Sequence, residues 1–219
     1  MIQIVPSLLV DSEKEFERRL RLVEHDVNTI HVDVLDGGLF PHTSWYDSRA
    51  IGAIRTSVKY ELHLMVENPL PIIEEWKQNV PSLIRAIVHA EMHRQTGSVV
   101  SHIRDLLQLE AGVALNPETP VEEVHEILHQ IDILTIMGVH PGQSGQSFLG
   151  DYILNKIRQV KAHRADLHIE VDGGVTLDLV PRLLDAGATH LCAASAIFSS
   201  AEPRAKLAEL QRTVSTLRA

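Results

Sequence analysis

Short apolar runs rich in β-branched residues alternate along the whole chain with longer stretches in which apolar residues recur every three or four positions. The short runs have the composition of β-strands, and the longer stretches have the period of amphipathic helices, as at Phe16, Leu20 and Val23 and again over residues 121–131. We predict eight strands, over residues 2–6, 29–34, 60–65, 83–89, 111–115, 131–137, 167–171 and 190–193.

The strict alternation of strand and helix predicts a parallel sheet covered by helices. Eight repeats in 219 residues leave about 27 residues for each unit, near the smallest length for a βαβ repeat. We therefore predict a closed (β/α)8 barrel of the TIM type, with an open doubly wound sheet as the alternative. No linker or low-complexity tract interrupts the pattern, so we expect one domain over residues 1–219. In such barrels, functional groups lie at the carboxyl ends of the strands.

Ionisable residues occupy the carboxyl ends of three predicted strands. His31 and Asp33 are two residues apart and share one face of their strand, His63 lies on the next strand, and Asp172 follows the seventh. Unpaired buried charges are costly, so these groups need compensation. Two imidazoles and two carboxylates suit a divalent cation with an open position for substrate, whereas the alternative is an internal His–Asp hydrogen-bond network without metal.

Glycine-rich segments follow the sixth and seventh predicted strands, at residues 138–146 and at Gly173 and Gly174, and the small residues Ala194 and Ser195 follow the eighth. Loops in these positions of a (β/α)8 barrel often present backbone N–H groups to a phosphate, and glycine permits the close approach. A phosphorylated small molecule is the predicted ligand. The alternative is that these glycines only form tight turns.

Composition narrows the classes of function. The chain is 44% hydrophobic without an apolar run long enough for a membrane span, and its formal charge of −9 disfavours nucleic acid and anionic membranes as partners. The one cysteine, Cys192, excludes an internal disulfide and is predicted to be an inert core residue. Residues 1–7 lack the features of a signal peptide, and we predict a cytoplasmic protein.

One motif matches the zinc-protease pattern, and we attribute the match to chance. His125, Glu126 and His129 have the His-Glu-x-x-His spacing, but the chain contains 13 histidines, which makes an accidental match common. The motif lies on a predicted covering helix, away from the strand ends, and no third ligand follows at a protease-like spacing. We therefore predict no metal site there.

Taken together, these motifs resemble the ribulose-phosphate 3-epimerase family over nearly the whole chain. The matching segments occur in the family's order on consecutive strand ends, at residues 5–9, 31–37, 63–65, 88–91, 115–120, 140–142, 170–175 and 195–198. The resemblance implies a metal-dependent inversion at C3 of D-ribulose 5-phosphate to D-xylulose 5-phosphate through a 2,3-enediolate. It also implies one divalent ion, Zn²⁺ first and otherwise Fe²⁺, Mn²⁺ or Co²⁺, and a homo-oligomer, a dimer or a hexamer.

The resemblance also assigns roles to individual residues. The implied metal ligands are His31, Asp33, His63 and Asp172, and Asp33 and Asp172 are also the implied acid–base pair. The implied substrate-binding residues are Ser7, His63, Met65 and Met137 for the sugar, and Gly142, Gly145, Gly173, Gly174, Ala194 and Ser195 for the phosphate.

Several positions around the predicted sugar and phosphate depart from the family pattern. They are Leu35, His140, Gln143, Ser144, Ala194 and the segment 38–42. None is a predicted metal ligand, so the reaction type is better supported than the substrate. Two alternatives stay open: a 3-epimerase of a ketohexose phosphate such as allulose 6-phosphate, and a phosphosugar-binding barrel without turnover.

Overall fold

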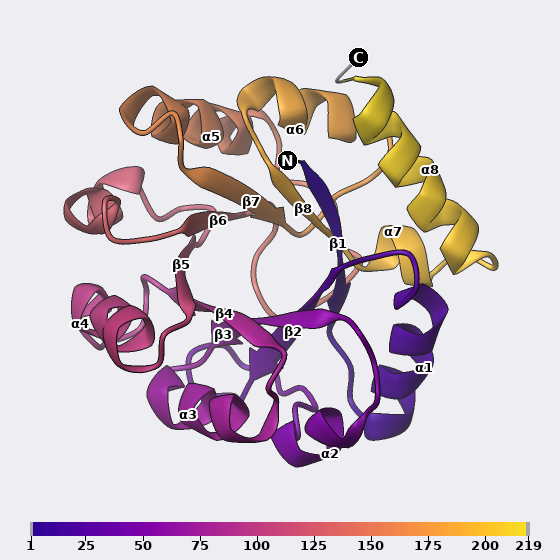
Figure 1. The fold of residues 1–219 in the computed structure, drawn as a ribbon. Helices are drawn as coiled ribbons and strands as arrows, with labels where there is room; N and C mark the ends of the chain where they lie inside the picture. Colours follow the sequence, from indigo (N-terminus) through magenta and orange to yellow (C-terminus); the bar gives the residue numbers. More distant parts are fainter. Residues whose placement is uncertain (1, 218–219) are drawn as a thin grey trace.

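Eight parallel strands pair in the order of the chain, and the first also pairs with the last, so the sheet closes into a barrel (Figure 1). This computed structural model describes residues 2–217. The strands are β1 (Gln3–Leu8), β2 (Thr29–Leu35), β3 (Lys59–Met65), β4 (Leu83–His89), β5 (Glu110–Leu115), β6 (Ile133–Met137), β7 (His168–Asp172) and β8 (His190–Ala193). The predicted (β/α)8 barrel is confirmed. Both ends of each predicted strand lie within two residues of the ends of the observed strand.

Helices surround the barrel on all sides, as Figure 1 shows. They are α1 (Glu13–Val23), α2 (Ser48–Ala53), α3 (Pro69–Asn79), α4 (Thr96–Ser101), α5 (Asp151–His163), α6 (Val180–Ala186), α7 (Ser195–Phe198) and α8 (Pro203–Thr216). A π-helix, η1 (His102–Leu106), continues α4, and a 3₁₀-helix, η2 (Val121–Ile127), joins β5 to β6.

The segment over residues 121–131 is not the amphipathic α-helix that its pattern predicts. It forms the 3₁₀-helix η2 and then turns before β6. Val121 and Val124 are both buried and are three residues apart, which is the period of a 3₁₀-helix. Because the apolar spacing of three also occurs in an α-helix, the sequence pattern does not separate the two forms.

The strands bury aliphatic residues on the side that faces the helices. Val32, Leu62 and Val88 belong to the main hydrophobic core, which joins the outer strand faces to the buried helix faces. A second, much smaller apolar cluster consists of Ile87, Ala114 and Ile133, on neighbouring strands β4, β5 and β6. Alternate residues of the same strands are polar and equally buried, among them Glu61, Arg85, Thr135 and Glu170. The interior of this barrel is therefore largely polar.

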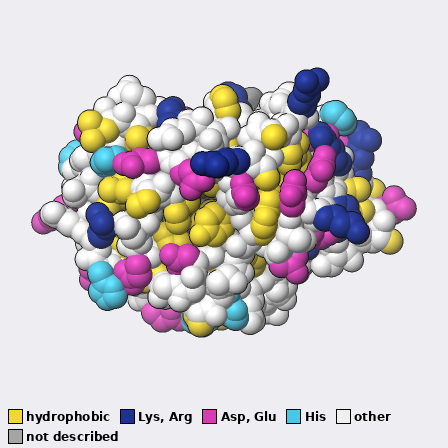
Figure 2. Space-filling view, turned by 90° about the horizontal axis from the view of Figure 1, so that it is seen from below, with side chains coloured by type: hydrophobic (Ala, Val, Ile, Leu, Met, Phe, Trp, Pro, Cys, Tyr) yellow, Lys and Arg dark blue, Asp and Glu magenta, His cyan; other side chains and the backbone are white. Residues whose placement is uncertain are grey.

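Viewed from below Figure 1, acidic and basic side chains are interspersed and hydrophobic side chains lie between them (Figure 2). No helix within residues 2–217 has the length and hydropathy of a bilayer span.

Candidate active site

Four predicted residues meet at the carboxyl end of the barrel. Asp33 on β2 pairs in register with His63 on β3, and Asp172 ends β7. The Nδ1 atom of His63 lies 3.1 Å from Oδ1 of Asp33 and 3.4 Å from Oδ2 of Asp172. With His31, these residues place four potential ligand atoms within 4.8 Å of one another. The structure thus brings these four residues together from distant parts of the chain.

The ring of His31 provides a test of whether this cluster suits a cation. Its Nε2 atom is completely buried, lies 3.4 Å from Oδ1 of Asp33, and is one of the few buried side-chain atoms in residues 2–217 without a hydrogen-bond partner. A buried polar atom without a partner is costly. A divalent cation would take the lone pair of this nitrogen and the charge of the neighbouring carboxylates, so the four residues fit the group that the family resemblance implies.

The electrostatics of the cluster favour positive charge between the carboxylates. Burial alone would lower the pKa of His63, but the carboxylates of Asp172 and Asp33 raise it to about 9. Burial alone would likewise raise the pKa of Asp33, but His31 and His63 hold it well below its usual range. Without a cation, a proton on imidazole supplies the compensating charge, and metal binding would displace that proton.

A chain of hydrogen bonds holds His63 from the side opposite the cluster. Its Nε2 atom lies 2.9 Å from Nε2 of His89, and Nδ1 of His89 lies 2.9 Å from Oε2 of Glu91. The hydroxyl of Thr119 and the backbone N–H of Asn116 donate to the other oxygen of Glu91. When Nδ1 of His63 is a ligand, Nε2 carries the proton and donates to His89, which in turn donates to Glu91.

A pocket opens above the cluster. Asp33 and Asp172 lie in its wall, and Oγ of Ser7 donates a 2.5 Å hydrogen bond to Oδ2 of Asp33. The pocket is also lined by nearly all of the predicted substrate-binding residues, namely Ser7, Met65, Met137, Gly142, Gly145, Gly173, Gly174, Ala194 and Ser195. His31 and His63 are fully buried and are not part of this lining. The structure thus brings the predicted phosphate-binding residues and both carboxylates into one cavity.

The turn after β7 requires glycine. Gly173 and Gly174 have φ of +95° and +70°, in the left-handed region that favours glycine. A Cβ atom on Gly173 would lie 2.3 Å from Cγ2 of Val139, and one on Gly174 would lie 2.7 Å from the backbone of Phe148. Neither glycine has room for a Cβ atom, so the backbone itself forms this wall of the pocket.

Most of the positions that depart from the family pattern lie at or near the pocket, whereas Leu35 is fully buried and does not line it. The loop after β2 reaches the loop after β6, where Nε2 of His42 lies 3.2 Å from Nε2 of Gln143. His140 is exposed and forms a 2.7 Å contact with Glu118. Phe40 packs edge-on against His89, with ring centroids 5.1 Å apart. The rearranged segment therefore contacts both the rim and a residue behind His63.

The remaining sequence predictions concern the protease-like motif and Cys192. His125 and His129 belong to neither of the possible metal-binding groups found within residues 2–217. Cys192 is a buried free thiol, as predicted, but it does not lie in the apolar core. Its Sγ atom lies 3.4 Å from Nδ1 of His31, inside the barrel.

Sequence reasoning missed the deeper polar residues of the barrel interior. Glu61 precedes His63 by two positions, and Glu170 precedes Asp172 by two positions, so each shares an inward face with a predicted ligand. Arg85 and His89 occupy the matching face of β4. The two-residue period of a strand, which places these residues on the same face as the predicted ligands, was therefore the sequence signal that could have found them.

Comparisons with known proteins identify the family. A sequence profile described as the ribulose-phosphate 3 epimerase family matches residues 3–198. The chain belongs to the ribulose-phosphate 3-epimerase family. This confirms the predicted resemblance and, with it, the enzyme class, an isomerase that epimerises a carbohydrate.

Two relatives illustrate how much of each chain the family likeness covers. The ribulose-phosphate 3-epimerase of Bacillus subtilis (strain 168) is 31% identical over an alignment 219 residues long, and the alignment covers 96% of this chain and 99% of the relative. The chloroplastic ribulose-5-phosphate-3-epimerase of Arabidopsis thaliana is 32% identical over an alignment 216 residues long, and the alignment covers 91% of this chain and 72% of the relative.

Solved structures support the barrel fold. A crystal structure of 3-hexulose-6-phosphate synthase superposes with a TM-score of 0.73 at 16% identity and covers 97% of this chain and 99% of its own. A crystal structure of KGPDC from Streptococcus mutans gives a TM-score of 0.75 at 11% identity and covers 100% of both chains. At such identities the likeness establishes the fold alone.

Proposed function

We propose that this epimerase inverts C3 of D-ribulose 5-phosphate to give D-xylulose 5-phosphate with the help of one divalent metal ion. The observation that best supports the proposal is that Asp33 and Asp172, in the wall of one pocket, meet two fully buried imidazoles. The two carboxylates come from β2 and β7, which β1 and β8 separate in the barrel. They therefore approach a bound sugar from different directions.

The chemistry needs such a pair of carboxylates. The C3–H bond of a 2-ketose is acidic only because the neighbouring ketone can accept charge as an enediolate, and inversion requires the proton to leave one face and return on the other. We assign these two proton transfers to Asp33 and Asp172. His31, His63, Asp33 and Asp172 would hold the metal ion, which would stabilise negative charge on the sugar oxygens as a Lewis acid.

The pocket walls would position the sugar phosphate. Backbone groups around Gly142, Gly145, Gly173, Gly174, Ala194 and Ser195 would hold the phosphate, in the position that phosphate sites often take in these barrels. Met65 and Met137 line the pocket, and Met137 pairs in register with Asp172, so the two methionines would cover the reacting carbons and exclude water. Ser7 would contact the sugar and keeps Asp33 in place through its hydrogen bond.

We propose Zn²⁺ as the ion, although two imidazoles and two carboxylates also accept Fe²⁺, Mn²⁺ or Co²⁺. We further propose that the enzyme works in the cytoplasm as a homo-oligomer, a dimer or a hexamer. The buried free thiol of Cys192 is compatible with a reducing compartment.

The first experiment combines metal analysis with turnover. We expect the purified protein to contain about one divalent ion per chain, to lose ribulose 5-phosphate turnover on chelation, and to regain it when Zn²⁺ is added. Full turnover after complete removal of metal would contradict the metal dependence. A loaded protein that converts neither a pentulose nor a hexulose phosphate would contradict the epimerase assignment and favour a binding protein without turnover.

The altered residues at the pocket rim, where His42 contacts Gln143, keep open a second candidate substrate, a 2-ketohexose 6-phosphate such as allulose 6-phosphate. These rim residues lie in the segments that depart from the family pattern. Comparing kcat/KM for the two sugar phosphates on the same preparation decides between them.

A further inference from the structure

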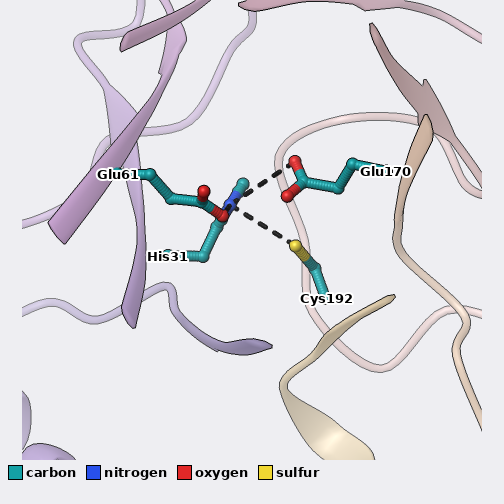
Figure 3. Close-up of side chains that lie close together, drawn as sticks. All are labelled: His31, Glu61, Glu170 and Cys192. Carbon is teal, nitrogen blue, oxygen red and sulfur yellow. Dashed lines mark hydrogen bonds and ion pairs between the residues drawn. The ribbon is translucent and has the colours of Figure 1, made fainter. Parts of the chain in front are cut away.

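His31 has a second ring nitrogen, Nδ1, that lies among the side chains of Glu61, Glu170 and Cys192 (Figure 3). Three buried groups from three other strands surround this atom. Oε1 of Glu61 lies 2.9 Å away, Sγ of Cys192 lies 3.4 Å away, and Oε1 of Glu170 lies 3.7 Å away. The partner that accepts from Nδ1 determines which nitrogen of His31 carries the proton.

The distances select Glu61 as that partner. A separation of 2.9 Å is a normal hydrogen bond, whereas 3.7 Å is too long for one. Glu170 already accepts a 2.8 Å hydrogen bond from the hydroxyl of Thr135 through the same oxygen. The thiol of Cys192 is a weak hydrogen-bonding group.

The second oxygen of Glu61 is also fully used. Nη1 of Arg85 donates to Oε2 of Glu61 at 2.5 Å, and the same guanidinium donates to Oε2 of Glu110 from Nε at 2.9 Å and Nη2 at 2.5 Å. Arg85 therefore compensates the buried charge of Glu61 and fixes the orientation of its carboxylate. Strand register supports this arrangement, because Glu61 pairs with His31 on one side and with Arg85 on the other.

We propose that Glu61, held by Arg85, is a positioning residue that keeps the proton of His31 on Nδ1 and so leaves Nε2 free to bind the metal ion. The proposal rests on the proposed function, since it assumes that a metal ion binds His31. It assigns a role to a residue that touches neither the metal nor the sugar. Carboxylates in this position orient metal-binding histidines and raise their basicity.

The same four side chains suggest a rival explanation, a second metal site formed by His31, Glu61, Glu170 and Cys192. The ion pair between Arg85 and Glu61 argues against it, because a second cation would have to bind a carboxylate whose charge the guanidinium already neutralises. The number of metal ions bound per chain distinguishes the two explanations.

The substitution Glu61→Gln tests the proposal without changing the shape of the side chain. Arg85 offers only donors, so the glutamine oxygen would face Arg85 and the NH₂ group would face Nδ1 of His31. His31 would then carry its proton on Nε2, where the metal ion has to bind. We expect Glu61→Gln to weaken Co²⁺ binding by at least about tenfold, measured by competition with a chelator and by the visible absorption of the bound ion.

Two matched variants separate this effect from a general loss of buried charge. Glu170→Gln changes the buried glutamate that lies beyond hydrogen-bond distance of His31, and Glu110→Gln changes the other carboxylate on Arg85. We expect both variants to bind Co²⁺ within about threefold of the native affinity. Thermal unfolding of each metal-free variant shows whether it is folded.

A direct measurement on the native protein does not depend on any variant. In the Zn²⁺-loaded protein, ¹⁵N NMR of the histidine rings should show His31 protonated on Nδ1 and unprotonated on Nε2. The opposite tautomer would overturn the proposal even if Glu61→Gln fails to fold.

The remaining outcomes are equally decisive. Native affinity in Glu61→Gln would overturn the proposal, as would an equal loss in Glu170→Gln. Two Co²⁺ ions bound to the native chain and one to Glu61→Gln would make Glu61 a ligand instead. If the native protein binds no Co²⁺ at all, the metal dependence of the proposed function fails together with this inference; if it binds one ion and only the Glu61 comparison fails, the proposed function is unaffected.

Discussion

Both imidazoles of the four-residue cluster are held from behind by acidic groups. His31 contacts Glu61, and His63 reaches Glu91 through His89. Because each imidazole has two nitrogens, a fixed partner on one of them defines what the other can do. At the level of single residues, the partners that hold these two imidazoles therefore lie outside the pocket.

The two proposed acid–base residues can be separated by isotope exchange. We expect Asp33→Asn and Asp172→Asn each to reduce interconversion by about 10³-fold, since removal of a positioned acid or base has an effect of this order. Each variant retains only one carboxylate, so uptake of solvent deuterium at C3 should survive for at most one epimer, and for a different one in each variant.

Metal content has to be measured alongside, because both residues are also proposed ligands. Reloading each variant with excess Zn²⁺ before the assay is the control. A variant that is fully loaded and interconverts the sugars at the native rate would contradict its acid–base role.

The residues at the strand ends could be predicted because their types are unusual there. His31, Asp33, His63 and Asp172 are polar groups in otherwise apolar runs, and the closed barrel brings the strand ends together. The deeper polar residues that contact them were missed because an isolated glutamate or arginine in a strand does not reveal which neighbour it pairs with. Only the register of β2, β3 and β4 places Glu61 between His31 and Arg85.

At the level of elements, the strands were predictable and the loops were not. A strand of five to seven residues carries its own signal in its apolar pattern. The contact between His42 and Gln143 joins loops that are 101 residues apart, and no local pattern predicts such a meeting. The 3₁₀-helix η2 has fewer residues per turn than an α-helix, and this difference is too small for the apolar pattern of a seven-residue segment to reveal.

The turn after β7 leads to a prediction about phosphate binding. Gly174→Ala would introduce a methyl group 2.7 Å from the backbone of Phe148 at a φ of +70°, so the turn has to move. We expect KM for the sugar phosphate to rise at least about tenfold and the protein to lose roughly 1–3 kcal/mol of stability from backbone strain.

Gly150→Ala is the matched control for that substitution. Gly150 also has a positive φ, +107°, but its Cβ would meet no atom within 4 Å, and it does not line the pocket. It should therefore lose stability through strain while KM stays unchanged. An equal rise in KM for both variants would show that the effect does not come from the turn beside the pocket.

At the level of the whole molecule, the polar barrel interior makes stability depend on pH. His190, at the start of β8, is only 4% exposed, and burial, aided by the charge of Arg85, lowers its pKa from 6.5 to about 4. Its folded form is neutral at pH 7, whereas the unfolded chain takes up a proton below pH 6.5. The contribution of His190 to stability is therefore present above pH 6.5 and is lost as the pH falls toward 4.

We expect His190→Gln to reduce the loss of unfolding free energy between pH 7 and pH 4 by up to about 3 kcal/mol. Urea unfolding at several pH values measures this slope. The exposed His25, changed to Gln, is the control. An unchanged slope in His190→Gln would contradict the assignment.

The aliphatic core lies between the strands and the helices, whereas the proposed reacting groups lie inside the barrel, so successive residues of one strand serve separate purposes. Val32 packs against helices, and its two neighbours, His31 and Asp33, face the proposed metal ion. Natural variation that tunes heat tolerance can therefore accumulate at every second position without disturbing turnover, and a change of chemistry can be tried at the intervening positions without rebuilding the scaffold.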